Sequence, residues 1–156
     1  MVDLTEFESI SPYTDEQASE ALGKLADHPA VAQASRYFFP EESPDFLKNV
    51  LKQIKTIDQF QVLVMQRFVR WVLEHTAKNF SYDGISNIDP NKKFLALSNH
   101  RDIIMDPAIT QLVLHTNGIP MTEIAVGDNL ITNEAIEYLI RSNRMIKVVR
   151  GISARE

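Results

Sequence analysis

The residues best suited to chemistry lie together in the segment 98–107, which reads Ser-Asn-His-Arg-Asp-Ile-Ile-Met-Asp-Pro. An imidazole titrates near neutral pH, so His100 can take a proton from a hydroxyl group that attacks a substrate. A carboxylate can fix the tautomer of the histidine and stabilise its charged form, and Asp102 and Asp106 both lie close enough in the sequence to do so. The segment therefore predicts a general base paired with a carboxylate.

The chain offers no recognisable protein nucleophile to accompany this base. It contains no cysteine and no Gly-x-Ser-x-Gly motif. The pattern therefore favours direct transfer, in which a hydroxyl of the substrate is itself the nucleophile. A purely structural interpretation stays open. Asp106 can cap a following helix that has Pro107 at its first position, and Asp102 with Arg101 can form a solvated loop pair.

The elements around this segment alternate between apolar strand patterns and helical patterns. Together they predict a mainly parallel α/β sheet with right-handed crossovers. The expected strands are residues 94–98, 123–126 and 145–149, and the expected helices are residues 107–115 and 133–141. Ligands in such sheets bind at the carboxyl ends of the strands, where His100 and Arg150 would lie.

The first half of the chain shows only helical periodicity. Apolar residues recur every three or four positions after Thr14, and the pattern predicts helices in four segments: 15–27, 30–39, 46–54 and 57–77. The break at His28-Pro29 separates the first two of these helices. We therefore expect a helical region over residues 1–80 and a segment of an α/β domain over residues 81–156.

Charge is distributed unevenly along the 156 residues. The net charge of −5 makes nucleic acid an unlikely partner, and the absence of cysteine excludes disulfides and thiolate metal sites. Residues 46–80 carry six basic and two acidic groups and are the only basic stretch. This stretch can contact an anionic membrane surface, or it can form helices whose charges are simply solvated. We expect no metal site.

Neither a transmembrane segment nor a secretion signal is expected. No uncharged apolar run of about 18 residues occurs, which is the length that a bilayer requires. The first residues, Met-Val-Asp-Leu-Thr-Glu, are acidic where a signal peptide is basic. These features predict a cytoplasmic protein, with peripheral contact at the cytoplasmic membrane face if residues 46–80 serve that purpose.

Residues 93–151 resemble the glycerolipid acyltransferase superfamily, which includes glycerol-3-phosphate and 1-acylglycerol-3-phosphate acyltransferases. The first block of that family is a strand followed by Asn/Ser-His, four residues and Asp, and residues 94–106 are similar to it. Residues 122–130 resemble the intermediate stretch. Residues 145–151, Met-Ile-Lys-Val-Val-Arg-Gly, resemble the second block, a strand that ends in arginine.

The resemblance implies transfer of a fatty acyl group from an acyl thioester, either acyl-CoA or acyl carrier protein, to a hydroxyl of a glycerol phosphate or lysophospholipid. His100 would be the general base and Asp106 the carboxylate that orients it. Arg150, with Arg101 as a weaker candidate, would bind the acceptor phosphate. Neither a metal nor a redox cofactor is implied.

This chain departs from the family pattern in two ways. Five residues separate His100 from Asp106 where the family has four, so Asp102 is the alternative catalytic carboxylate. The family's third block, a Pro-Glu-Gly-Thr-Arg-like phosphate loop, is not found. We therefore expect the first half of a catalytic domain, with little activity by itself and an exposed sheet edge that could favour homo-oligomers. The alternative function is a non-catalytic lipid-binding or protein-interaction module.

Overall fold

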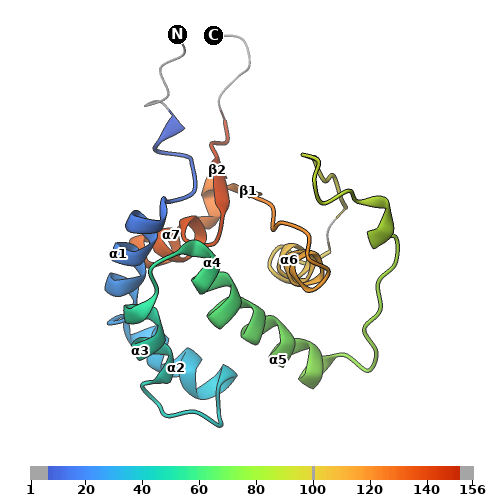
Figure 1. Ribbon diagram of the computed structural model, residues 1–156. Coiled ribbons are helices and arrows are strands. Elements are labelled where there is room, and N and C mark those ends of the chain that lie inside the picture. The colour runs from blue at the N-terminus through green and yellow to red at the C-terminus, as the bar shows by residue number, and fades with distance from the viewer. Residues whose placement is uncertain (1–6, 100, 152–156) are drawn as a thin grey trace. The chain divides into compact units, whose positions relative to one another are not determined.

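The computed structural model describes residues 7–99 and 101–151 (Figure 1). The chain divides into two compact units. Unit 1 comprises Met1–Val64 and Glu123–Glu156, and unit 2 comprises Met65–Thr122. The chain thus enters unit 1 twice, so the units follow a different division from the expected regions 1–80 and 81–156.

Unit 1 begins with the helices predicted from the periodicity of the first half. They are α1 (Asp15–Leu25), α2 (Pro29–Phe38), α3 (Phe46–Gln53) and α4 (Ile57–Phe60). A capping box opens α1, since the Thr14 hydroxyl accepts a hydrogen bond from the Gln17 N–H and the Gln17 side chain accepts one from the Thr14 N–H. Pro29 occupies the first turn of α2, where its missing N–H costs nothing, and His28 caps that helix.

The long helix expected over residues 57–77 is interrupted. After α4 the backbone widens into the π-helix η2 (Gln61–Met65) and then continues as α5 (Gln66–Thr76). Gln61, the first residue of the π-helix, is almost fully buried although its neighbours on the apolar face are Phe60 and Val64. The interruption therefore coincides with a polar side chain placed inside the core.

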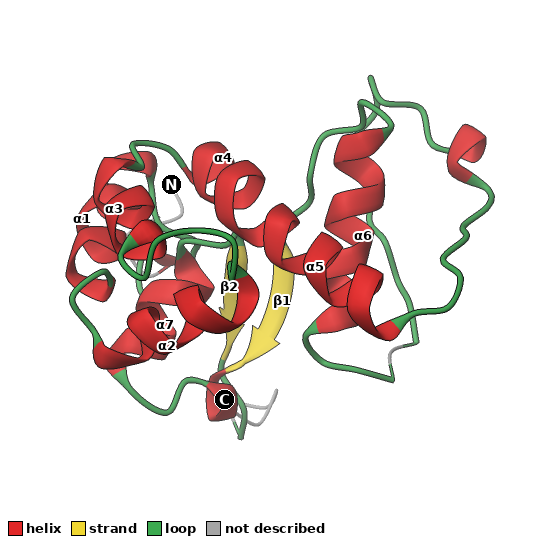
Figure 2. Ribbon diagram, turned by 90° about the horizontal axis from the view of Figure 1, so that it is seen from below, coloured by secondary structure: helices red, strands yellow, loops and turns green. Residues whose placement is uncertain are grey.

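The second part of unit 1 forms a small α/β layer. Strands β1 (Ile124–Gly127) and β2 (Met145–Val148) pair in parallel with Ile124 opposite Met145, and η4 (Asp128–Leu130) and α7 (Glu134–Arg141) connect them (Figure 2). The described residues thus combine helices with a two-stranded parallel sheet, in agreement with the predicted α/β class. Two of the three predicted strands are confirmed.

The core of unit 1 is formed by the inner faces of its helices. Helix α1 packs against α3, α4 and α7, and α7 also packs against β2. The buried apolar side chains at these contacts include Ala18, Leu22, Leu51, Ile54 and Phe60. The N-terminal segment is tied to the same layer, because the Lys147 N–H donates to the Ile10 carbonyl at 2.8 Å.

Unit 2 contains α5, the 3-10 helix η3 (Ile85–Asn87) and α6 (Met105–Thr116). Helices α5 and α6 lie side by side, as both views show. Val69 of α5 and Leu112 and Leu114 of α6 are buried. The buried Gln111 side chain exchanges hydrogen bonds with the backbone of Thr122, at 3.0 Å in each direction, so it fixes the chain that leaves α6.

The prediction of a buried strand at residues 94–98 is wrong. The segment forms no strand and pairs with no strand in the described part of the chain. Leu95 and Leu97 are 84% and 87% exposed. A run of apolar residues becomes a strand only when a neighbouring strand satisfies its backbone groups, and an apolar pattern alone does not supply that neighbour.

Among the described residues, no helix combines the length and the apolar character needed to cross a membrane.

A Schellman motif ends α6. Gly118 adopts a left-handed conformation with a φ of 69°. The Ile119 N–H then donates to the Leu114 carbonyl and the Gly118 N–H to the His115 carbonyl, both at 3.0 Å. Leu114 and Ile119 are both buried, which supplies the apolar contact that usually accompanies this motif.

Two glycines should respond in opposite directions to alanine. Gly118→Ala places a Cβ on a left-handed backbone and should destabilise the protein by about 1 kcal/mol. Gly23 lies within α1, where an added Cβ would meet no atom within 4 Å. Gly23→Ala should therefore stabilise by about 0.5–1 kcal/mol. Urea unfolding followed by circular dichroism checks both values, and a loss of stability in Gly23→Ala would contradict this account.

Candidate functional site

Two carboxylates organise the turn that opens α6. The Asp106 Oδ2 atom accepts hydrogen bonds from the N–H of Arg101 at 2.6 Å and of Asp102 at 3.1 Å. The Asp102 Oδ1 atom accepts from the N–H of Ile104 at 2.8 Å and of Met105 at 2.7 Å. The two side chains therefore fold residues 101–106 into a closed turn. His100, the predicted base, lies outside the described residues.

The structure exchanges the roles expected for the two aspartates at the helix start. Asp102, rather than Asp106, accepts from the N–H groups of the N-cap residue Ile104 and of Met105, the first helical residue, so Asp102 acts as the capping carboxylate although it is not the N-cap residue itself. Helix α6 starts at Met105, and Pro107 is its third residue instead of its first. Asp106 bonds backward to the segment that follows His100. The Oδ1 atom of Asp106 accepts no hydrogen bond from the described residues. The residues Asp102 and Arg101 are exposed.

Arg150 lies in unit 1, two residues after β2. Its backbone N–H donates to the Asp128 Oδ1 atom at 3.3 Å, which ties the end of β2 to the residue that follows β1. A Cβ added to Gly127 would lie 2.7 Å from the Arg150 Nε atom, so the guanidinium occupies the space that this glycine leaves open. Asp102 and Asp106 belong to unit 2.

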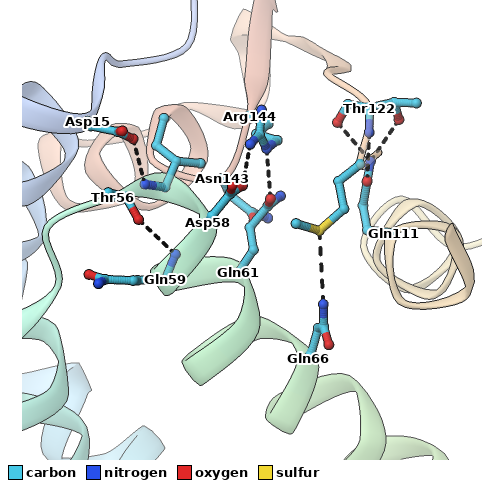
Figure 3. Close-up of polar contacts among 12 residues, drawn as sticks. Asp15, Thr56, Asp58, Gln59, Gln61, Gln66, Gln111, Thr122, Asn143 and Arg144 are labelled. Carbon is cyan, nitrogen blue, oxygen red and sulfur yellow. Dashed lines mark hydrogen bonds and ion pairs between the residues drawn. The ribbon is translucent and has the colours of Figure 1, made fainter. Parts of the chain in front are cut away.

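A polar network missed by the sequence analysis holds the start of β2 (Figure 3). Arg144 has a φ of 58°, in the left-handed region, directly before the strand. Its Nε atom donates to the Gln61 Oε1 atom at 2.8 Å, and its Nη2 atom forms an ion pair with Asp58. Gln61 also donates to Asn143 at 3.4 Å. Only the polar residue in the apolar helical stripe signalled this network, since its partners lie more than 80 positions away in the sequence.

The basic stretch of residues 46–80 does not form one charged surface within a single unit. Lys48 and Lys52 both pair with Asp27 of unit 1 at 2.9 Å. These two lysines hold the pKa of the Asp27 carboxyl below its usual value, with hydrogen bonding as the largest cause. Arg70 and Lys78 belong to unit 2. Part of the positive charge is therefore used inside unit 1.

The remaining histidines have local contacts. The Nδ1 atom of His28 accepts from the Ala30 N–H at 3.3 Å, and His75 bonds to the Trp71 carbonyl and stacks on its ring at 4.3 Å. Over residues 7–99 and 101–151, no group of three or more His, Cys, Asp or Glu side chains is arranged to hold a metal ion. Among the described side chains, Asp106, Asp102 and Arg101 thus remain the candidates in unit 2 and Arg150 the candidate in unit 1.

Comparison of the chain with protein-family models, with curated protein sequences and with solved structures gave no significant match.

The capping role of Asp102 can be separated from its charge. Asp102→Ala should lower the free energy of unfolding by about 1 kcal/mol, because two N–H groups of the first turn of α6 lose their acceptor. Asp102→Asn keeps an oxygen acceptor and should stay within about 0.5 kcal/mol of the wild type. Chemical denaturation measures both, and equal effects of the two substitutions would argue against the cap.

Two buried glutamines form a matched test of the network around Arg144. Gln61→Leu should cost about 1–2 kcal/mol, since Arg144 and the buried Asn143 both lose a partner. Gln66 is also buried, but its contact with the Met121 sulfur is 4.0 Å long and a thioether accepts weakly. Gln66→Leu should therefore be close to neutral. Thermal or urea unfolding that ranks the two substitutions the other way would contradict the network's role.

Proposed function

We propose that the protein is an acyltransferase that moves a fatty acyl group from an acyl thioester to a hydroxyl of a glycerol phosphate or lysophospholipid. The observation that supports this most is the turn at the start of α6. There the Asp106 carboxylate holds the N–H groups of Arg101 and Asp102, the two residues that follow His100. The backbone directly after the proposed base is therefore fixed by hydrogen bonds, and a fixed neighbouring backbone is one requirement for a preorganised base.

The proposed reaction is a direct transfer. His100 takes the proton of the acceptor hydroxyl while that oxygen attacks the carbonyl carbon of the thioester. The carbon–sulfur bond then breaks, and the departing sulfur receives the proton from the imidazolium. The products are an ester and a free thiol, so atoms and electrons balance with neither a metal nor a redox cofactor.

Asp106 is the proposed carboxylate that orients His100, because its Oδ1 atom accepts no hydrogen bond from the described residues while Oδ2 secures the turn. Asp102 is the alternative. Arg150, and more weakly Arg101, are the proposed ligands of the acceptor phosphate, since a planar guanidinium can bind phosphate oxygens through two hydrogen bonds. Gly127 leaves room for the Arg150 side chain beside the end of β1.

The acceptor and donor define the proposed setting of the enzyme. A cytoplasmic protein that uses a lysophospholipid must reach the membrane surface, and residues 46–80 are the proposed contact. Within this stretch Lys55, Arg70 and Lys78 form no ion pair with a carboxylate of the described residues. Self-association is a further proposal, based on the exposed apolar side chains described next.

One observation favours a second candidate, a non-catalytic lipid-binding or protein-interaction module. Leu95 and Leu97 expose more than four fifths of their surface, and Ile103 and Ile104 are 55% and 59% exposed. Several exposed apolar side chains within residues 94–99 and 101–104 are typical of a segment that contacts a lipid or another protein. Such a module would bind lysophospholipid vesicles without releasing thiol from acyl-CoA.

Substitution of the proposed base distinguishes the two functions. Free thiol released from acyl-CoA is measured with the full-length gene product, using glycerol 3-phosphate and a lysophospholipid as acceptors. His100→Ala should lower turnover by at least about 100-fold, because the general base is lost. His115→Ala is the matched control, since this exposed histidine lies near the other end of α6 and should leave turnover unchanged. Equal turnover in His100→Ala and wild type, or no thiol release with either acceptor, would refute the proposal.

A further inference from the structure

The end of α5, the segment that follows it and the second half of α6 line an open pocket of about 390 Å³ within unit 2. We refer to it as the aromatic pocket. Leu73 and Ala77 of the first part and Leu112 and Val113 of α6 contribute apolar side chains to its lining. None of the residues 101–106 lines the pocket, and its lining on α6 begins at Leu112. The pocket is therefore distinct from the candidate catalytic turn, although both involve α6.

Two aromatic rings line the pocket while remaining accessible. Phe80 is 43% and Tyr82 48% exposed, and their ring centroids lie 5.8 Å apart. Tyr82 is held in place because its hydroxyl accepts a hydrogen bond from the Asn117 Nδ2 atom at 3.0 Å. The same amide nitrogen donates to the Val113 carbonyl at 2.7 Å. A fixed, half-exposed aromatic ring offers its face to a flat ligand at little cost in side-chain entropy.

Three charged residues line the pocket, and the two cationic ones can donate hydrogen bonds to a ligand. Arg70, Glu74 and Lys78 follow one another at intervals of four residues and all line the cavity. Neither Arg70 nor Lys78 forms an ion pair with a carboxylate of the described residues, so Glu74 does not engage either cation. Two cations against one carboxylate leave a net positive lining, which suits a phosphate group.

We propose that the aromatic pocket binds the adenine nucleotide end of acyl-CoA, an inference that rests on the proposed function for its choice of donor. The ligand matches each part of the lining: the purine ring stacks on Tyr82 or Phe80, and its phosphates pair with Arg70 and Lys78. Asn79 and Thr116, which also line the cavity, can pair with polar edge groups of the purine. A bare acyl chain would use the apolar side chains alone and leave both cations without a partner.

The length of α6 fits this assignment. The ten residue-to-residue steps from Asp106 to Thr116 span about 15 Å along the helix axis. In acyl-CoA the nucleotide and the thioester are separated by the pantetheine arm, which extends over a distance of that order. A nucleotide in the pocket could therefore present its thioester toward the opposite end of the same helix, where the candidate turn lies.

Binding measurements test the pocket without relying on turnover. The probes are coenzyme A and adenosine 3′,5′-bisphosphate, titrated calorimetrically into the full-length protein. Tyr82→Leu, which keeps the apolar bulk, and Lys78→Ala should each raise the Kd for both probes by about tenfold. Lys93→Ala and Tyr37→Leu are matched controls at exposed positions outside the pocket and should leave both values unchanged.

Several results would overturn the inference. These are equal affinity in wild type and the pocket variants, binding of decanoate at this site without competition from the nucleotide, and binding of acyl carrier protein but not coenzyme A. Thermal unfolding of each variant checks that Tyr82→Leu remains folded, and Lys78→Ala, at a position outside α5, provides the independent variant. His100→Ala should bind coenzyme A as tightly as the wild type. If His100→Ala also keeps full transferase turnover, the proposed function is refuted. The coenzyme A affinities of the pocket variants still decide whether the pocket binds the nucleotide.

Discussion

Two parallel strands cannot be joined by a tight turn, and this constraint organises unit 1. After β1 the chain passes through α7 and returns to the end of the sheet where β1 began. Only then can β2 pair with β1 in parallel. The crossover helix packs on α1, so the strands and the N-terminal helices share one core. Arg144 completes the return with a left-handed backbone just before β2, and the side chains of Asp58 and Gln61 hold its guanidinium. The position of Arg150 at the far end of β2 therefore depends on contacts made to the π-helical region at its near end.

Local signals in the sequence were sufficient for much of the fold. The capping box at Thr14 and the α/β alternation after residue 122 depend on neighbours within a few positions, and both occur in the structure. The failures concern partners that are distant. Residues 94–98 have a strand pattern but no pairing strand among the described residues. Gln61 was the single polar signal in the apolar stripe of residues 57–77, and it did not reveal that its partners would be Arg144 and Asn143.

The candidate site shows the same difference between local and distant information. Both carboxylates accept hydrogen bonds from backbone N–H groups of residues 101–105. The spacing of Asp102 and Asp106 predicted that Asp106, or alternatively Asp102, would orient His100, and this stays a prediction because His100 lies outside the described residues. It did not reveal which of them caps α6, because a side chain at either position can reach free N–H groups at a helix start. The hydrogen bond from the Arg150 backbone N–H to the Asp128 carboxylate joins residues that are 22 positions apart. Only the parallel register of β1 and β2 brings these residues together.

The missing side chain at Gly127 links two positions that are far apart in the sequence. The Arg150 guanidinium, together with the Asn129 Oδ1 atom, crowds the volume that a Cβ at position 127 would occupy. A larger residue and a long cation therefore compete for one space at the end of the sheet. Among related chains, the two positions should vary together: glycine where an arginine follows the second strand, and a larger residue only where that cation is replaced or turned away. Such covariation would show that the space at the ends of β1 and β2 limits which side chains can occupy positions 127 and 150 together.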